Sequence, residues 1–216
     1  MSKYGYVGKE SDIPQQAFKA NAGVLSVNDH LALSQENKLT QYGQLELIET
    51  QIYSTGVASI DFTSIQESTY DVHFLTLDNF QTASDNVEVF QIQLYENGTL
   101  ETASVYDYTF QRGRVNGTFT EYSSSTSSYL KINQNGGNAT NETSCGYVYF
   151  YYLGDSTKNS FATSHSIVTQ NDSVQNIAYG SSLLPQQSRV DGIRIKTSSG
   201  NYSSFKASLY GIRNYE

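Results

Sequence analysis

The chain has 216 residues, of which 38% are hydrophobic, 13% aromatic and only 16% charged. This composition is typical of a folded chain that is long enough to bury a core, most simply as one domain with an appendage. The 13 basic and 21 acidic residues give a net charge of −8, which argues against a nucleic-acid-binding protein, since such proteins need a clustered basic face. The abundance of tyrosine, serine and asparagine indicates an all-β fold with many turns.

Membrane spans, secretion signals and disulfides are not indicated. A membrane helix needs about 20 apolar residues, whereas the longest apolar and aromatic run, Tyr147–Leu153, is far shorter. The N-terminal sequence has no apolar core of a secretory signal, so we expect any export to use another route, such as cell lysis. A single cysteine, Cys145, excludes an intrachain disulfide.

The first 43 residues differ from the rest because they show no sustained hydrophobic period. Gly23–Val27 has the composition of a short strand. Asn28 or Asp29 is suited to cap a short helix over His30–Lys38. A helix of about ten residues is marginal by itself, so it should form only when docked. We therefore predict an extended N-terminal assembly arm, residues 1–43, that carries at most one short helix.

Residues 44–216 carry strand and turn signals at the spacing of a β-sandwich. The expected strands are Gln44–Ile52, Ala58–Phe62, Tyr70–Leu77, Val87–Tyr95, Thr102–Phe110, Val115–Tyr122, Tyr129–Ile132, Tyr147–Leu153, Phe161–Thr169, Val190–Thr197 and Ser204–Ile212. They predict a two-sheet antiparallel β-sandwich of the jelly-roll kind, with a barrel as the alternative. No repeat of constant period occurs, which disfavours propellers and solenoids.

Turn signals between these strands predict the connections. Glu96–Thr99 contains Asn-Gly, the strongest short signal for a type I′ hairpin turn. Arg112–Arg114 and Ser198–Asn201 predict two further tight turns. Polar loops are expected at Ser123–Ser128 and Asn133–Glu142.

Alternation along the strands predicts the core. The inward-facing residues are expected to be Ile60, Phe62, Val72, Phe74, either Thr76 or Leu77, either Val105 or Tyr106, either Ile167 or Val168, Ile193, Ile195, Phe205, Ala207 and Leu209. The strand Tyr147–Leu153 is aromatic on both faces, which predicts a central strand covered on each side.

No motif indicates an enzyme. The chain has no G-x-S-x-G elbow, and His73 stands inside an expected strand as a structural residue. Glycoside hydrolysis needs only two carboxylates, so the sequence leaves it open, but the absence of tryptophan disfavours it. No zinc or EF-hand spacing occurs, so neither a metal nor a cofactor is predicted. Calcium is an alternative to simple turn formation for four loop acids, which are Asp78, Asp85, Asp155 and Asp172.

Tyrosines are the remaining candidates for binding. Tyr147, Tyr149 and Tyr151 share one face of an expected strand, and Tyr122 and Tyr129 flank the serine-rich segment. Tyrosine combines apolar area with a hydroxyl group, which suits both sugars and protein interfaces. These five residues are our candidate glycan-binding set, and the alternative is that they are core or sheet-face residues.

The C-terminal strands resemble a domain that is common in structural proteins of tailed bacteriophages. In that family a hairpin of the form G-I-R-x-x-x-S-S-G-N precedes a final strand that ends in L-Y-G, and Asp191–Ile212 has both features. Asp61–Thr63 followed by Tyr70–Phe74 resembles the opening of the same domain, and Gly23–Asp29 resembles its N-terminal arm. Ser123–Glu142 matches no part of it.

The resemblance implies a virion structural protein, a head- or tail-associated accessory subunit of the decoration, fibre or receptor-binding kind. It implies no catalytic residues and no cofactor. The expected partners are other virion proteins, further copies of the chain and a host surface glycan, but neither nucleic acid nor a membrane. The expected location is the virion, after assembly in the host cytoplasm. The apolar anchors of the arm are predicted to be Tyr4, Tyr6, Ile13, Phe18, Val24 and Leu25.

Two other functions fit the same sequence. One is a carbohydrate-binding adhesion module that uses the tyrosine faces to recognise host surface polysaccharide. The other is a lyase or hydrolase that acts on capsular polysaccharide.

Overall fold

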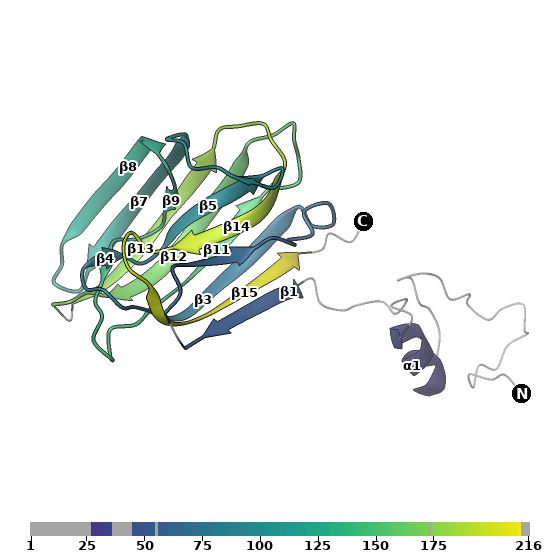
Figure 1. Ribbon diagram of the computed structural model, residues 1–216, viewed down its shortest axis with the longest axis horizontal. Coiled ribbons are helices and arrows are strands. Elements are labelled where there is room, and N and C mark those ends of the chain that lie inside the picture. Colours follow the sequence, from purple (N-terminus) through teal and green to yellow (C-terminus); the bar gives the residue numbers. More distant parts are fainter. Residues whose placement is uncertain (1–26, 36–44, 55, 173, 213–216) are drawn as a thin grey trace, which may run out of the picture. The chain divides into compact units, whose positions relative to one another are not determined.

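The computed structural model describes residues 27–35, 45–54, 56–172 and 174–212. The chain divides into two compact units, Met1–Gln44 and Leu45–Glu216. The second unit is built almost wholly of antiparallel strands (Figure 1), so the all-β prediction is confirmed.

The first unit contains one described element, the helix α1, Val27–Gln35. It begins three residues before the expected start at His30, so Asn28 lies inside the helix rather than at its cap. The side chains of Val27 and Leu31 are exposed. Residues 23–26 of the expected short strand and all six predicted anchors of the arm lie outside the described residues.

The strands of the second unit form two main sheets. Their bounds are β1 Leu45–Tyr53, β2 Ser59–Phe62, β3 Val72–Thr82, β4 Val87–Glu88, β5 Gln91–Glu96, β6 Thr99–Leu100, β7 Tyr106–Arg114, β8 Phe119–Ser127, β9 Leu130–Lys131, β10 Asn135–Gly136, β11 Ser144–Tyr151, β12 Ser160–Thr169, β13 Gln175–Leu184, β14 Val190–Lys196 and β15 Tyr202–Ile212. The large sheet has the order β1-β15-β3-β11-β12-β13-β7-β8, and the smaller one has the order β2-β14-β5-β6, with β9 paired to β5. β4 and β10 form a separate pair.

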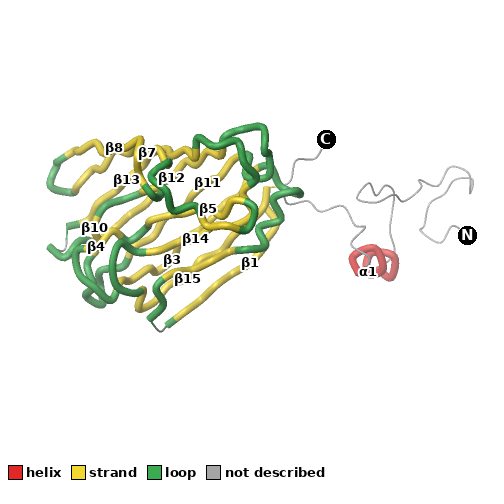
Figure 2. The backbone as a smooth tube through the Cα atoms, turned by 45° about the horizontal axis from the view of Figure 1, so that its top comes forward, coloured by secondary structure: helices red, strands yellow, loops and turns green. Residues whose placement is uncertain are grey.

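The smaller sheet lies over one face of the large sheet, as Figures 1 and 2 show. Because β1 and β8 are the ends of the large sheet and do not pair with each other, the unit is an open two-layer sandwich and not a barrel. We call the covered face of the large sheet its inner face and the opposite face its outer face.

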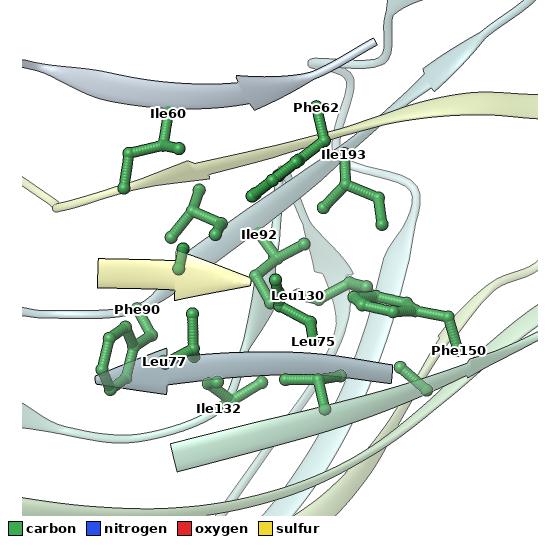
Figure 3. Packing of buried hydrophobic residues seen from close by; sticks show 14 of the residues in the cluster. Ile60, Phe62, Leu75, Leu77, Phe90, Ile92, Leu130, Ile132, Phe150 and Ile193 are labelled. Atoms are coloured by element: carbon green, nitrogen blue, oxygen red, sulfur yellow. The ribbon is translucent and has the colours of Figure 1, made fainter. Parts of the chain in front are cut away.

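The core lies between the inner face and the smaller sheet (Figure 3). Leu75 of β3 and Phe150 of β11 contribute from the large sheet, and Phe62, Ile92 and Ile193 contribute from the smaller one; all are fully buried. Burying an aliphatic or aromatic side chain of this size contributes about 1.5–3 kcal/mol, so this layer is the main source of stability.

Much of the predicted core is confirmed. The expected inward residues that are buried are Ile60, Phe62, Leu77, Tyr106, Val168, Ile193, Ile195, Phe205, Ala207 and Leu209. The Asn-Gly turn is also confirmed, because Asn97 and Gly98 have φ values of 48° and 79°, as a type I′ turn requires. His73 is buried, and its Nε2 lies 2.8 Å from the carbonyl oxygen of Ile65.

The predicted register of β3 is wrong. His73, Leu75 and Leu77 point inward, so Val72 and Phe74 lie on the outer face and are only half-buried. Both faces of this strand are apolar, so alternation alone could not show which face is covered. The prediction for Tyr147–Leu153 is also half wrong: β11 is central in the large sheet, but Tyr147 is 40% exposed on the uncovered face.

Two predicted connections are wrong. Arg112–Arg114 lies inside β7, and the turn follows it, where Gly117 has a φ of 83°. Ser123–Ser127 is part of β8 rather than a loop. The strand β13 was not expected from the sequence, because most of its inward-facing residues are asparagine, alanine and serine instead of large apolar residues.

Two expected hairpins differ in the fold. The predicted strand Val87–Tyr95 is divided into β4 and β5. After the Asn-Gly turn only the short strand β6 pairs with β5, and the expected returning strand is β7 of the large sheet. The expected closing hairpin over Asp191–Ile212 does not form, because β14 belongs to the smaller sheet and β15 to the large one.

Candidate functional site

The outer face of the large sheet is the candidate functional site. Along β11, Val148 and Phe150 point inward and are fully buried, whereas Tyr147, Tyr149 and Tyr151 point outward. The strand register places the outward residues of neighbouring strands side by side, for example Tyr149 with Phe74 of β3. No described strand or helix of the second unit covers this face.

One half of the outer face is formed by β1, β15, β3 and β11, and we call its apolar surface the β1-side patch. It consists of Leu45, Leu47, Ile52, Phe74, Tyr147, Tyr149 and Tyr210. Four of its rings form a cluster centred on Phe74, with ring centroids 4.6 Å from Tyr149, 5.9 Å from Tyr147 and 6.1 Å from Tyr210. Leu47 and Ile52 are 59% and 66% exposed.

Charged groups are scarce on this half of the face. Asp78 and Lys206 lie opposite each other in the β3–β15 register, and Lys206 also lies opposite Ile52 of β1. β1 is also an edge strand of the large sheet, so one of its sides is not paired with another described strand. An apolar face next to an open edge is a surface that proteins generally cover.

The other half of the outer face is hollowed by three adjoining cavities of about 450, 510 and 310 Å³. We call them together the distal groove. Its main lining residues are Tyr151, Phe161, Leu183, Thr109, Gln111, Glu121, Phe119, Ile167 and Ile177. Volumes of this size match those of small-molecule sites.

The register gives the distal groove apolar ends and a polar middle. At one end Phe161 pairs with Leu183, and at the other Ile167 pairs with Ile177. Between them the strand pairs bring the hydroxyl group of Thr109 next to that of Ser181. The middle can therefore form hydrogen bonds while the ends offer apolar contact.

The five candidate tyrosines are divided between the two faces. Tyr147, Tyr149 and Tyr151 share the outer face as predicted. Tyr122 and Tyr129 do not join them, because they point to the inner side of β7 and β8. The ring of Tyr122 stacks on Phe110 at 4.9 Å, and the Tyr129 hydroxyl donates to the Glu88 carboxylate at 3.0 Å. A binding role for the two latter residues stays a prediction.

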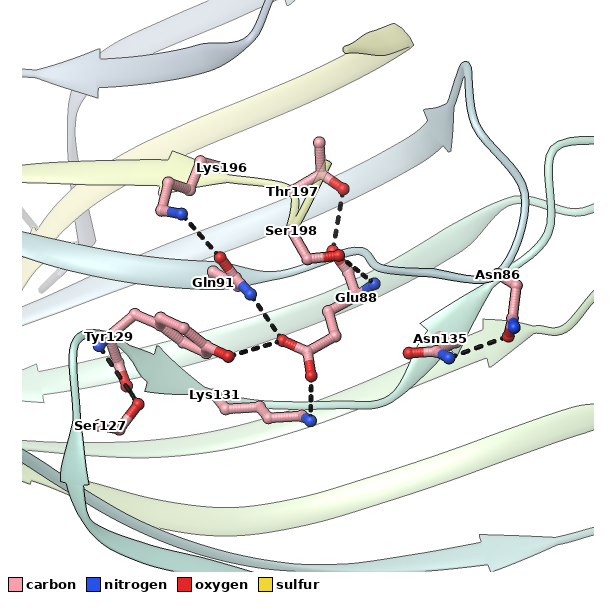
Figure 4. A network of polar contacts seen from close by, with 10 residues as sticks. All are labelled: Asn86, Glu88, Gln91, Ser127, Tyr129, Lys131, Asn135, Lys196, Thr197 and Ser198. Atoms are coloured by element: carbon pink, nitrogen blue, oxygen red, sulfur yellow. Dashed lines mark hydrogen bonds and ion pairs between the residues drawn. The ribbon is translucent and has the colours of Figure 1, made fainter. Parts of the chain in front are cut away.

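Glu88 is the centre of a polar network under that inner side (Figure 4). Its carboxylate accepts hydrogen bonds from Tyr129, from Gln91 at 2.6 Å and from the ammonium of the buried Lys131. Burial alone would raise the pKa of Glu88, but the hydrogen bonds from Lys131 and Gln91 outweigh it and lower that pKa. The group is therefore ionised and saturated, as in a structural ion pair rather than an acid catalyst.

A different carboxyl group, that of Glu96, has a raised pKa. Burial and a hydrogen bond with Glu101 raise the pKa of Glu96, although Ser188 donates to Glu96 and opposes the shift. Glu96 ends β5 next to the Asn-Gly turn, on the smaller sheet and not on the outer face. The sequence pattern gave no sign of this pair of carboxyl groups.

Metal binding receives no support from the described residues. Among them, no group of three or more histidine, cysteine, aspartate or glutamate side chains could hold a metal ion. Three of the four candidate calcium ligands have other partners: Asp85 accepts a hydrogen bond from the backbone N–H of Asn86, Asp155 accepts hydrogen bonds from Thr157, and Asp172 pairs with Arg114 at 2.7 Å.

Comparisons add no relative to this picture. The sequence matches no protein-family profile, none of the curated proteins and no solved structure. Within the described ranges, no helix has the length and apolar character that a membrane crossing requires.

Proposed function

We propose that this chain is a structural subunit of a tailed-bacteriophage particle, a head- or tail-associated accessory protein anchored through residues 1–43. The observation that carries the proposal is the uncovered β1-side patch. Soluble monomers rarely expose a large contiguous apolar surface, and this one combines exposed leucines with a cluster of aromatic rings. In this proposal, the patch is an interface that assembly covers.

The cover that fits best is a second copy of the chain. Four strands of about eight residues span about 500 Å² in projection, from strand spacings of about 4.8 Å and rises of about 3.3 Å. A standard interface buries about 800 Å² per partner, so the patch supplies more than half of that area and the adjoining edge of β1 adds to it. Copies with a net charge of −8 repel one another, which favours an interface that is poor in charge.

The sequence resemblance supports the same assignment. The segment Asp191–Ile212, which carries the clearest resemblance to phage structural proteins, forms β14 and β15. These strands contribute to both layers of the sandwich, and Ile193, Ile195 and Leu209 are fully buried. Residues of the segment that resembles the family are therefore among those that hold the two sheets together.

The order of the strands also indicates which edge of the large sheet an anchored subunit would turn toward the particle. β1 begins at Leu45, directly after the proposed anchoring segment. β8 is the opposite edge of the sheet, about 34 Å away at seven strand spacings. An anchored subunit of this kind would hold its β1 edge near the particle and its β8 edge away from it.

The proposal is tested by mass spectrometry of intact particles that have been purified from the producing host by density centrifugation. We expect peptides of this chain at a fixed ratio to the major head or tail proteins, and loss of the chain when residues 1–43 are deleted. If the chain is found only in the soluble lysate and never in purified particles, the assignment is wrong.

A further inference from the structure

We propose that the distal groove binds a neutral polysaccharide in an extended conformation. The inference goes beyond the proposed function and does not need it, since the groove belongs to the second unit alone. Of the five tyrosines expected from the sequence only Tyr151 lines the groove, and the inference rests instead on the aromatic ends Phe161 and Phe119 and the polar middle around Thr109.

The groove has the length and layout that a sugar chain needs. From Leu183 to Ile177 along β13 it measures about 20 Å at about 3.3 Å per residue. Hydroxyl, amide and carboxylate groups lie in the middle, on Thr109, Gln111 and Glu121. Sugar rings present apolar faces and polar edges, so alternating apolar and hydrogen-bonding surface complements them better than a purely apolar peptide or lipid.

Both aromatic ends are held in place before any ligand binds. Tyr152 has a φ of 62°, which is rare for a residue other than glycine. Its ring lies edge-on to Phe161, with centroids 6.4 Å apart, and the Lys158 ammonium lies 4.5 Å from its centre. Phe161 itself is 44% exposed. An aromatic surface that is fixed in advance loses little entropy on binding.

The second end is fixed by a glycine. Gly113 of β7 lies opposite Phe119 of β8 in the strand register. A Cβ atom at Gly113 would lie only 3.0 Å from the Phe119 ring and 3.3 Å from Ile177, so the missing side chain lets this ring approach β7. Phe119 is nevertheless 67% exposed, which leaves its surface free for contact.

Charge favours a neutral ligand over an acidic one. The groove contains the carboxylates of Asp107 and Glu121, and the whole chain carries a net charge of −8. The one guanidinium among its lining residues, that of Arg114, is paired with Asp172. An acidic polysaccharide would be repelled, whereas a polyhydroxylated neutral chain can donate hydrogen bonds to these carboxylates.

The test is affinity electrophoresis of the full chain in gels that contain dextran, laminarin or galactomannan, with alginate as the acidic polymer. We expect at least one neutral polymer to retard the protein and alginate to leave it unretarded. Titration followed by tyrosine fluorescence then gives the affinity, because the chain has 18 tyrosines and no tryptophan.

Three substitutions locate the binding. Phe161→Ala and Phe119→Ala should each weaken binding about tenfold, as loss of an aromatic contact typically does. Thr109→Val keeps the side-chain shape and should weaken binding about fivefold through the loss of one hydrogen bond. The matched control is Thr102→Val, which makes the same change at an exposed threonine between β6 and β7, outside both the groove and the β1-side patch, and should bind as the unaltered chain does.

The proposal is overturned if none of the three neutral polymers retards the protein, if alginate retards it as strongly, or if both aromatic variants bind normally. Thermal unfolding curves that match that of the unaltered chain show that the variants are folded. Presence or absence of the chain in purified particles is measured separately, so failure of this inference and failure of the proposed function give different results.

Discussion

The two faces of the large sheet are built from the same strands but have different partners. On the inner face, Phe150 and Leu75 are fully buried against the smaller sheet. On the outer face, Tyr149 and Phe74 of the same two strands contact each other and remain partly open. The inner face therefore supplies most of the stability of the sandwich, and the residues of the outer face can be suited to binding a partner. The predictions below test this division.

The largest effect on stability should come from the inner face. Phe150→Ala leaves a cavity between the sheets and should lower the free energy of unfolding by about 4 kcal/mol. Tyr149→Ala, one residue away on the outer face, removes mainly the ring contact with Phe74 and should cost about 1 kcal/mol. Urea unfolding of both variants measures the difference, and equal losses would contradict the division.

The polar network beneath β7 and β8 should come next. Glu88→Gln leaves the ammonium of the buried Lys131 without its counter-charge, and should lower the free energy of unfolding by about 3 kcal/mol. Glu121→Gln is the control, because Glu121 is exposed on the outer face and its substitution should change stability by less than about 0.5 kcal/mol. A similar loss in both variants would show that the network contributes nothing specific.

Acid should weaken the fold through the same group. The pKa of Glu88 in the folded chain is lower than its ordinary value of 4.5, since the hydrogen bonds from Lys131 and Gln91 outweigh the effect of burial. Its contribution is therefore complete above pH 4.5 and is lost as the pH falls through the folded-state pKa. Thermal unfolding between pH 7 and pH 3 should show a shallower acid loss in Glu88→Gln than in the unaltered chain. Parallel curves would exclude this role.

Substitutions in the β1-side patch should affect association and not stability. Leu47→Glu and Ile52→Glu place charges on side chains that are already exposed, so the free energy of unfolding should change by less than about 0.5 kcal/mol. Light scattering should show loss of the self-associated form, because association would then bury carboxylates that have no counter-charge. Phe119→Ser, at the far edge of the same face, should keep the association.

The smallest effect on the fold should come from removal of the arm. Deletion of residues 1–43 removes most of a separate compact unit, so thermal unfolding of the remaining sandwich should be unchanged. Incorporation into particles should be lost. Normal incorporation of the shortened chain would show that these residues are not the anchor.

The sequence predicted the elements whose apolar residues lie on one face only. In β14 and β15, Ile193, Ile195, Phe205 and Leu209 alternate with polar residues, and all four are buried. The Asn-Gly turn was predictable because both positive φ values are intrinsic to that pair.

The candidate site was harder to predict, for a physical reason. In β3 both Phe74 and Leu75 are apolar, so the feature that makes the outer face a binding surface also removes the alternation that would orient the strand. The distal groove brings together Thr109 and Phe119 of the neighbouring strands β7 and β8 with Phe161 of β12, which is distant in sequence. Only the strand register shows that these residues share one surface.

The most direct test of the central claim uses the single cysteine as a probe of the outer face. Cys145 is exposed on β11, next to Tyr147 of the β1-side patch. We predict that a maleimide labels Cys145 slowly in the self-associated chain and rapidly in Leu47→Glu at the same protein concentration. Equal and rapid labelling of both would contradict the account, because it would mean that no second copy covers this face.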